Sequence, residues 1–142
     1  MATWNDVSRI ALALPETVEL PDSNGLKWEV HKKHFAWERP LRKSDIAALG
    51  DHVPTGDILG VRVAELIDKQ GLIGSDPDVF FTIPHFADYP AVLVLIERIS
   101  LDQLAEVLTD GWLSRAPKRL AASWAAANGL TLPPAPAAEP PL

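Results

Sequence analysis

Residues 26–39 carry a two-residue alternation of apolar and polar side chains, which constrains the fold more than any other feature of the sequence. The alternation occupies two runs, LKWEV and FAWER, that flank the short polar link HKKH. Successive side chains of a β-strand point to opposite faces of the sheet, so the runs predict two strands of a β-hairpin. Large aromatic side chains on strands are usually buried, so we predict that three of them lie in the core on the inner face: Trp28, Phe35 and Trp37.

Other periodic segments predict the remaining helices and strands. Three helices are predicted where an N-cap residue precedes apolar side chains at helical spacing; they begin after Thr3, Ser44 and Ser100. Two further helices are predicted, at 64–72 and from Pro117 to Asn128. β-Branched and aromatic runs predict strands at 57–63, 78–83 and 91–97, and 16–25 is predicted to be a turn region. This order predicts an α+β fold in which an antiparallel sheet has its helices packed on one face.

Length and composition predict one domain in a reducing compartment. We assign residues 1–129 to that domain, and the Pro/Ala-rich residues 130–142 to an extended tail. The chain has no cysteine, which excludes disulfides and thiolate metal sites and fits a cytoplasmic location. The first fifteen residues include charged side chains, and no apolar run approaches the ~20 residues of a membrane span, so we expect neither a signal peptide nor a membrane partner.

The formal net charge of −6 is distributed unevenly along the chain. Residues 26–43 hold six basic residues against two acidic ones, whereas residues 44–110 hold three basic residues against twelve acidic ones. Residues 111–127 then add three basic residues and no acidic ones. If the fold brings the two basic segments together, an acidic protein can still present a basic face.

Enzyme motifs are absent from the sequence. It contains no G-x-S-x-G nucleophile turn, no phosphate-binding P-loop and no G-x-G-x-x-G dinucleotide motif, so we expect no catalytic residues and no cofactor. The spacing of His31 and His34 recurs in metal sites, but a site needs three or four convergent ligands. We therefore interpret the two histidines as solvated residues of the hairpin link and expect no metal.

Two groups of residues are candidates for binding. Basic residues of the hairpin and of the last helix–helix junction could contact phosphates, or could be solvated surface charge: Lys32, Lys33, Arg39, Arg42, Lys43, Arg115, Lys118 and Arg119. The loop TIPHFADYP between two predicted strands could be a rigid plug over the sheet or a recognition loop. A pocket near this loop would use His85, Phe86, Tyr89 and Trp112.

Three segments resemble the MmcQ/YjbR family, a bacterial group also described as a domain of unknown function. They are KWEVHKKHFAWERPL, the stretch from DVFFTIPHFADYP to WLSRAPKRLAA, and the LALP that ends the first predicted helix. The resemblance runs over most of residues 3–127 and implies a CyaY-like (frataxin-like) α+β fold with a double-wing arrangement. It also implies DNA binding, for which Lys33, Lys118 and Arg119 match the basic positions of the family.

Two functions of different classes follow from these observations. The first is a non-enzymatic, DNA-binding or transcription-associated protein whose basic residues contact double-stranded DNA. The acidic net charge argues against it, because neutralisation of phosphates by Lys and Arg dominates such affinity. The second is a binding module for a small molecule or a protein partner, with a pocket near residues 84–90.

Overall fold

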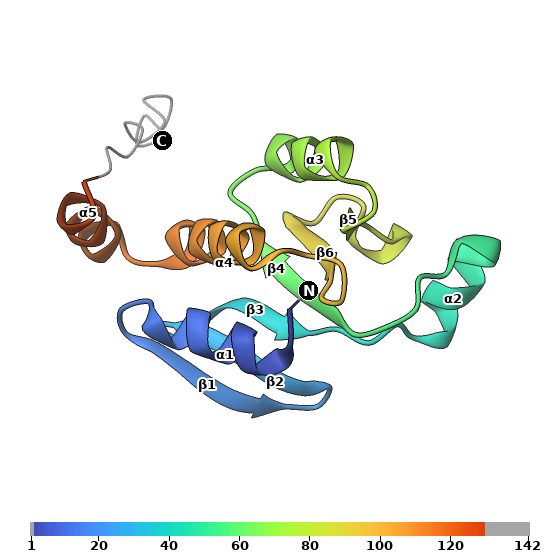
Figure 1. The fold of residues 1–142 in the computed structure, drawn as a ribbon, viewed down its shortest axis with the longest axis horizontal. Helices are drawn as coiled ribbons and strands as arrows, with labels where there is room; N and C mark the ends of the chain where they lie inside the picture. The colour runs from blue at the N-terminus through green and yellow to red at the C-terminus, as the bar shows by residue number, and fades with distance from the viewer. Residues whose placement is uncertain (1, 130–142) are drawn as a thin grey trace, which may run out of the picture.

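Six strands form one antiparallel sheet in the computed structural model, which describes residues 2–129 (Figure 1). The strand order is β1-β2-β3-β4-β6-β5, and every neighbouring pair is antiparallel. The strands are β1 (Thr17–Asp22), β2 (Gly25–Val30), β3 (Lys33–Glu38), β4 (Ile58–Arg62), β5 (Phe80–Phe81) and β6 (Ala91–Leu95). The helices are α1 (Trp4–Ala13), α2 (Lys43–Leu49), α3 (Leu66–Ser75), α4 (Leu101–Arg115) and α5 (Lys118–Ala127), with short 3₁₀ turns η1 (Gly50–His52) and η2 (Pro84–Phe86). The predicted α+β fold with an antiparallel sheet is confirmed.

The predicted hairpin is formed by β2 and β3. Its two turn residues, His31 and Lys32, have φ angles of 49° and 68°, the left-handed values that tight two-residue hairpin turns require. Residues 16–25, predicted to be a turn region, instead contain the edge strand β1, with Glu16 in the turn before it and Ser23 and Asn24 in the turn that joins it to β2. Pro21 is tolerated in β1 because an edge strand has one side without hydrogen-bonding partners.

A β-bulge in β3 changes which face each aromatic residue of the hairpin occupies. Trp28 pairs with Ala36 and the next residue, Glu29, pairs with His34, so Phe35 is an extra residue on β3. Phe35 therefore joins Trp28 on one face of the sheet. Trp37, predicted on that same face, packs in a separate cluster on the opposite face. The prediction of its face was wrong, although its burial, at 8 % exposure, agrees with the expectation.

Helices α1 and α4 cover one face of the sheet (Figure 1). Their apolar side chains pack against the aromatic and β-branched residues of β2, β3 and β4 in the larger core cluster. Trp112 of α4 is fully buried there, and its indole Nε1 donates a hydrogen bond to the carbonyl oxygen of Pro15 at 3.1 Å. The expectation that Trp112 lines a pocket was therefore wrong, because it completes the core under α4.

The segment after β5 covers part of the other face. The predicted strand at 78–83 is reduced to Phe80 and Phe81, because the chain leaves the sheet at Ile83 and turns through η2. Ile83 and Phe86 then pack on Trp37, Ile58 and the β6 residues in the second cluster. We call residues 84–90 the covering loop, because they lie over this face of the sheet.

The helix ends follow the predicted caps at Thr3 and Ser100, but the cap predicted at Ser44 was wrong. Helix α2 begins at Lys43 with Arg42 as its N-cap, because the Arg42 amide donates to the side chain of Asp45. Thr3 and Ser100 each accept a hydrogen bond from the backbone amide three residues on, and both complete capping boxes. Pro117 occupies the N-cap of α5, one position earlier than the helical position predicted for it. None of the helices in this part of the chain combines the length and apolar character needed to cross a lipid bilayer. The predicted tail at 130–142 lies outside the described residues.

Candidate functional site

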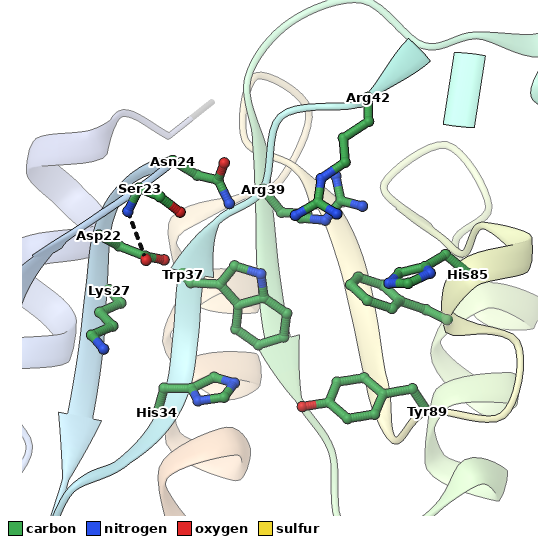
Figure 2. A pocket seen from close by; sticks show the side chains of 11 residues that line it. Asp22, Ser23, Asn24, Lys27, His34, Trp37, Arg39, Arg42, His85 and Tyr89 are labelled. Atoms are coloured by element: carbon green, nitrogen blue, oxygen red, sulfur yellow. Dashed lines mark hydrogen bonds between the residues drawn. The ribbon is translucent and has the colours of Figure 1, made fainter. Parts of the chain in front are cut away.

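A cleft of about 480 Å³ lies between the covering loop and the β2–β3 hairpin (Figure 2). Four separate stretches of the chain contribute its walls: the β1–β2 turn, the facing side of β2 and β3, the segment after β3, and the covering loop. The lining residues are Asp22, Ser23, Asn24, Lys27, His34, Trp37, Arg39, Arg42, His85, Phe86 and Tyr89. The two binding regions singled out in the sequence, the basic hairpin and the loop at 84–90, thus face each other across one cleft.

Aromatic side chains form the floor and one wall of the cleft. The rings of Trp37 and Phe86 meet edge to face with centroids 6.2 Å apart, and His34 lies edge-on to Trp37 at 4.9 Å. Tyr89 and His85 flank Phe86 at 5.4 Å and 5.2 Å. Gly60 makes this arrangement possible, because a Cβ atom there would lie 2.6 Å from the Trp37 ring.

Arg39 also lines the cleft but is buried, with 3 % of its surface exposed. Its Nη2 lies 3.0 Å from Oδ2 of Asp45 at the start of α2, and its guanidinium lies 5.2 Å from the Phe86 ring centroid. Burial opposes ionisation of Asp45, but the amide of Arg42 and the charge of Arg39 hold the pKa of this carboxyl below its ordinary value of 3.8. Arg39, expected as an exposed phosphate contact, is therefore committed to an internal ion pair.

Arg42 is the exposed cation of the cleft. Among residues 2–129 it has no carboxylate within 4.0 Å, whereas Lys27, lower in the cleft, is 3.1 Å from Glu29. Figure 2 shows the Arg42 side chain above Trp37 in this view of the cleft. The charge of Arg42 is thus available to an anionic ligand, while Lys27 is neutralised by its neighbour.

Lys69 of α3 fixes the covering loop, a role that the sequence analysis did not anticipate. The side chain is 3 % exposed, and its Nζ donates hydrogen bonds to the carbonyl oxygens of Phe86 and, at 3.0 Å, of Tyr89. Burial lowers the pKa of Lys69, and the charge of Asp88 opposes that shift. The sequence did carry a signal for this role: Lys69 occupies a position of the predicted helix at which the helical spacing calls for an apolar residue.

The remaining basic candidates divide between the two ends of β3. Arg42 and Lys43 follow its C-terminal end, and Lys32 and Lys33 lie at its N-terminal end. At the N-terminal end, two contacts bring the hairpin turn close to the last turn of α4. His31 of the turn pairs with Glu16 at 2.8 Å, and the adjacent Pro15 accepts a hydrogen bond from the Trp112 indole of α4. The hairpin turn is therefore close to the α4–α5 junction. The junction carries three further basic residues: Arg115, which is partly buried, and the exposed Lys118 and Arg119.

His31 and His34 do not converge on a common point. His31 is exposed in the turn and pairs with Glu16, whereas His34 is partly buried in the cleft beside Trp37. Burial lowers the pKa of His34, and nearby positive charges lower it further. The two side chains therefore occupy different environments rather than one site.

A second groove, about 670 Å³, lies between α3 and α4. Its apolar wall includes Ile67, which is 69 % exposed, and Leu72. Asp110 lies on the rim of this groove. Burial raises the pKa of its carboxyl, and the neighbouring carboxylates of Glu106 and Asp68 raise it further. This groove shares no residue with the cleft.

Comparisons with known proteins identify relatives and a fold. The chain is 48 % identical over 132 residues to the uncharacterized proteins Mb2600 of Mycobacterium bovis and Rv2570 of Mycobacterium tuberculosis, matching 91 % of this chain and 100 % of each relative. The crystal structure of Deinococcus radiodurans protein DR2400, a DUF419 domain, superposes with a TM-score of 0.62 and 18 % identity, over 92 % of this chain and 91 % of that chain. This identity establishes similarity of fold alone. No protein-family model matches the chain.

Proposed function

The chain belongs to the same family as these uncharacterized mycobacterial proteins. From the geometry of its own cleft, we propose that it binds a small anionic molecule. The observation that carries this proposal is the convergence of Arg42, which is exposed and has no carboxylate partner within residues 2–129, with an aromatic wall on one concave site. The volume of about 480 Å³ falls in the range of small-ligand pockets.

The chemistry of the lining defines the kind of ligand. Arg42 offers a planar, permanently charged fork that matches a carboxylate or phosphate group. Trp37, Phe86 and Tyr89 offer flat apolar surface to a ring or hydrocarbon body. A small molecule with an anionic head and a planar body satisfies both features.

Thermal-shift and calorimetric titrations with benzoate, AMP and inorganic phosphate test the proposal. We expect at least one probe to raise the melting temperature, and Arg42→Gln to weaken its binding by roughly tenfold or more, since a hydrogen bond to a charged group contributes about 1.5–3 kcal/mol. The neighbouring Lys43→Gln is the matched control, because Lys43 is exposed but does not line the cleft. Equal binding by wild type and Arg42→Gln would contradict the proposal.

We propose that this family is part of the MmcQ/YjbR group. The motif resemblance in three segments supports this assignment, and so does the fold similarity to DR2400 over nine-tenths of both chains. Because the group is associated with DNA binding, duplex DNA is the second candidate ligand.

One observation favours the DNA candidate: exposed basic side chains from two distant segments lie at the same end of the molecule, namely Lys32, Lys33, Lys118 and Arg119. Fluorescence anisotropy with a short duplex at ~50 mM salt tests it, because phosphate contacts are strongest at low salt. We expect the slope of log K against log salt to fall by about one when Lys33 or Lys118 is replaced by Gln. Flat anisotropy would exclude this function without affecting the cleft proposal.

A further inference from the structure

Helix α4 lies close against the sheet at Gly111. A Cβ atom at this position would lie 3.0 Å from the carbonyl oxygen of Arg62 and 3.3 Å from that of Phe35. The helix therefore crosses directly above β3 and β4. Arg115 follows one helical turn later on the same side, which places it near Arg62, the last residue of β4.

Positive groups accumulate around this pair. The pKa of Arg115 is lowered by burial and by the charge of Arg62. The pKa of His34 is lowered by burial and then by the charges of Arg115, Arg62 and Lys27, with only Glu29 opposing them. Glu29 already pairs with Lys27 at 3.1 Å, so it does not neutralise the two arginines.

The fold supplies no carboxylate to either arginine. Within residues 2–129, neither Arg62 nor Arg115 has a carboxylate oxygen within 4.0 Å. The Nε atoms of both are buried without a hydrogen-bond acceptor in this part of the chain. Arg62 donates from Nη1 to the hydroxyl of Tyr89 at 2.9 Å, and its guanidinium lies 4.8 Å from the Tyr89 ring centroid. Two like charges with unsatisfied donors are unfavourable unless an anion joins them.

We propose that Arg62 and Arg115 form a phosphate-binding site outside the cleft lining, next to the cleft residues Tyr89 and His34. Both side chains are partly exposed, so an ion from solvent can reach the pair. Two guanidinium forks suit the several oxygens and double negative charge of a phosphate group, and the Tyr89 hydroxyl adds one further donor. The site is independent of Arg42, so it stands even if the cleft takes no ligand there.

Phosphate titration monitored by NMR of the His34 ring tests this site. We expect inorganic phosphate to bind saturably and to raise the pKa of His34, because the anion offsets the charges of Arg62 and Arg115. The other charged groups facing His34 are Lys27 and Glu29, which pair with each other at 3.1 Å. No saturable change in the His34 signals on adding phosphate would overturn the proposal.

Variants separate this site from the cleft site and from general surface charge. Arg115→Gln should weaken phosphate binding by about 10- to 100-fold, the loss of a charge-assisted hydrogen bond, and should itself raise the pKa of His34. That second effect shows that the fold and the local geometry persist in the variant. Arg115→Lys should retain part of the affinity, because it keeps the charge but loses the fork. Lys43→Gln, which is exposed and lies outside the cleft lining, is the control and should bind phosphate as wild type does. A loss of phosphate binding with Arg42→Gln in place of Arg115→Gln would overturn the site.

Two further arms distinguish the source of the phosphate group. AMP represents small phosphorylated molecules, and a short duplex represents the nucleic-acid backbone. We expect AMP to displace inorganic phosphate in an Arg115-dependent manner. If duplex DNA displaces it and AMP does not, the small-molecule source is wrong and the Arg62–Arg115 pair belongs to a nucleic-acid surface.

Discussion

Arg39 and Asp45 form an ion pair that is almost completely removed from solvent. Asp45 also accepts a hydrogen bond from the Arg42 amide at 2.8 Å, which links the pair to the start of α2. In such a pair, removal of one partner costs more than the pair itself contributes, because the other charge stays buried. The pair therefore holds the segment that carries Arg42 against the cleft wall.

Arg39→Met should lower the free energy of unfolding by about 3–5 kcal/mol at neutral pH, the cost of leaving the Asp45 carboxylate without its partner. Urea unfolding measures this loss, and the exposed Arg42→Met should change stability by only about 0.5 kcal/mol. The pKa of Asp45 is depressed in the folded state, so its contribution is present above pH 3.8 and is lost as the pH falls through the folded-state value. The penalty of Arg39→Met should accordingly shrink in acid, and a constant penalty would contradict this account.

His34 should give the protein a component of acid sensitivity. Its pKa in the folded state lies below the ordinary 6.5, so below that pH the unfolded chain binds the proton first. The free energy of unfolding should therefore fall as the pH drops from 6.5 towards the folded-state pKa. His34→Gln should remove this part of the pH dependence in a series of urea titrations. Gln70→Ala, at an exposed position without a titratable side chain, is the control and should leave the slope unchanged.

At the scale of elements, the covering loop depends on α3 for its position. The loop contains a single 3₁₀ turn and is tied to the helix by the two hydrogen bonds of Lys69. Because both acceptors are backbone carbonyls, the lysine fixes the course of the chain from Phe86 to Tyr89. Those two residues line the cleft, so the shape of the cleft depends on this lysine.

Lys69→Met should lower stability by about 1–3 kcal/mol, since it removes two charge-assisted hydrogen bonds, although both carbonyl oxygens keep a backbone amide donor. Hydrogen exchange should show faster opening of residues 84–90 while the amides of α4 keep their protection. Binding of a cleft ligand should weaken together with the loop. Lys118→Met, on an exposed helix position, is the matched control; unchanged exchange in the loop of Lys69→Met would show that the lysine is not its anchor.

The sequence predicted the elements well where a pattern was continuous and local. The β2–β3 hairpin follows from its alternation, and α4 follows from the capping box at Ser100. The alternation predicted the wrong face of the sheet for Trp37. The bulge at Phe35 adds one residue to β3, so the side chains after it point to the face opposite the predicted one. The strand β1 was missed because Pro21 and its neighbours are residues typical of turns. An edge strand tolerates them, because one of its sides has no hydrogen-bonding partner.

Assembly of the cleft could not be predicted in the same way. The basic hairpin and the loop at 84–90 were each recognised, but as separate sites, because nothing local shows that the chain returns across the sheet after Ile83. Arg62 was overlooked although it carried a usable signal: it is a charged residue at the end of an otherwise apolar strand. Trp112 was misplaced because a large aromatic on a helix has the same appearance in sequence whether it fills a core or lines a pocket.

At the scale of the whole molecule, the two faces of the sheet are used differently. One face is sealed by α1 and α4 over a continuous core (Figure 1), and the other is covered in part, which leaves the cleft. One proposed anion site lies in the cleft and the other lies next to its residue Tyr89, while the acidic residues that dominate the net charge are concentrated in residues 44–110. Arg115 belongs to α4, which covers the sealed face. The distance between α4 and the sheet therefore sets the position of Arg115.

The spacing between α4 and the sheet can be tested with two glycines that should respond in opposite ways. Gly111→Ala should lower stability by about 1–3 kcal/mol, because its methyl group would lie 2.8 Å from Cγ1 of Val61 and 3.0 Å from the Arg62 carbonyl oxygen. Gly71→Ala in α3 meets no atom within 4 Å and should raise stability by about 0.5–1 kcal/mol, the ordinary preference of a helix for alanine. Thermal and urea unfolding measure both variants. A gain from Gly111→Ala would mean that α4 does not pack this closely, and would remove the geometric basis for placing Arg115 beside Arg62.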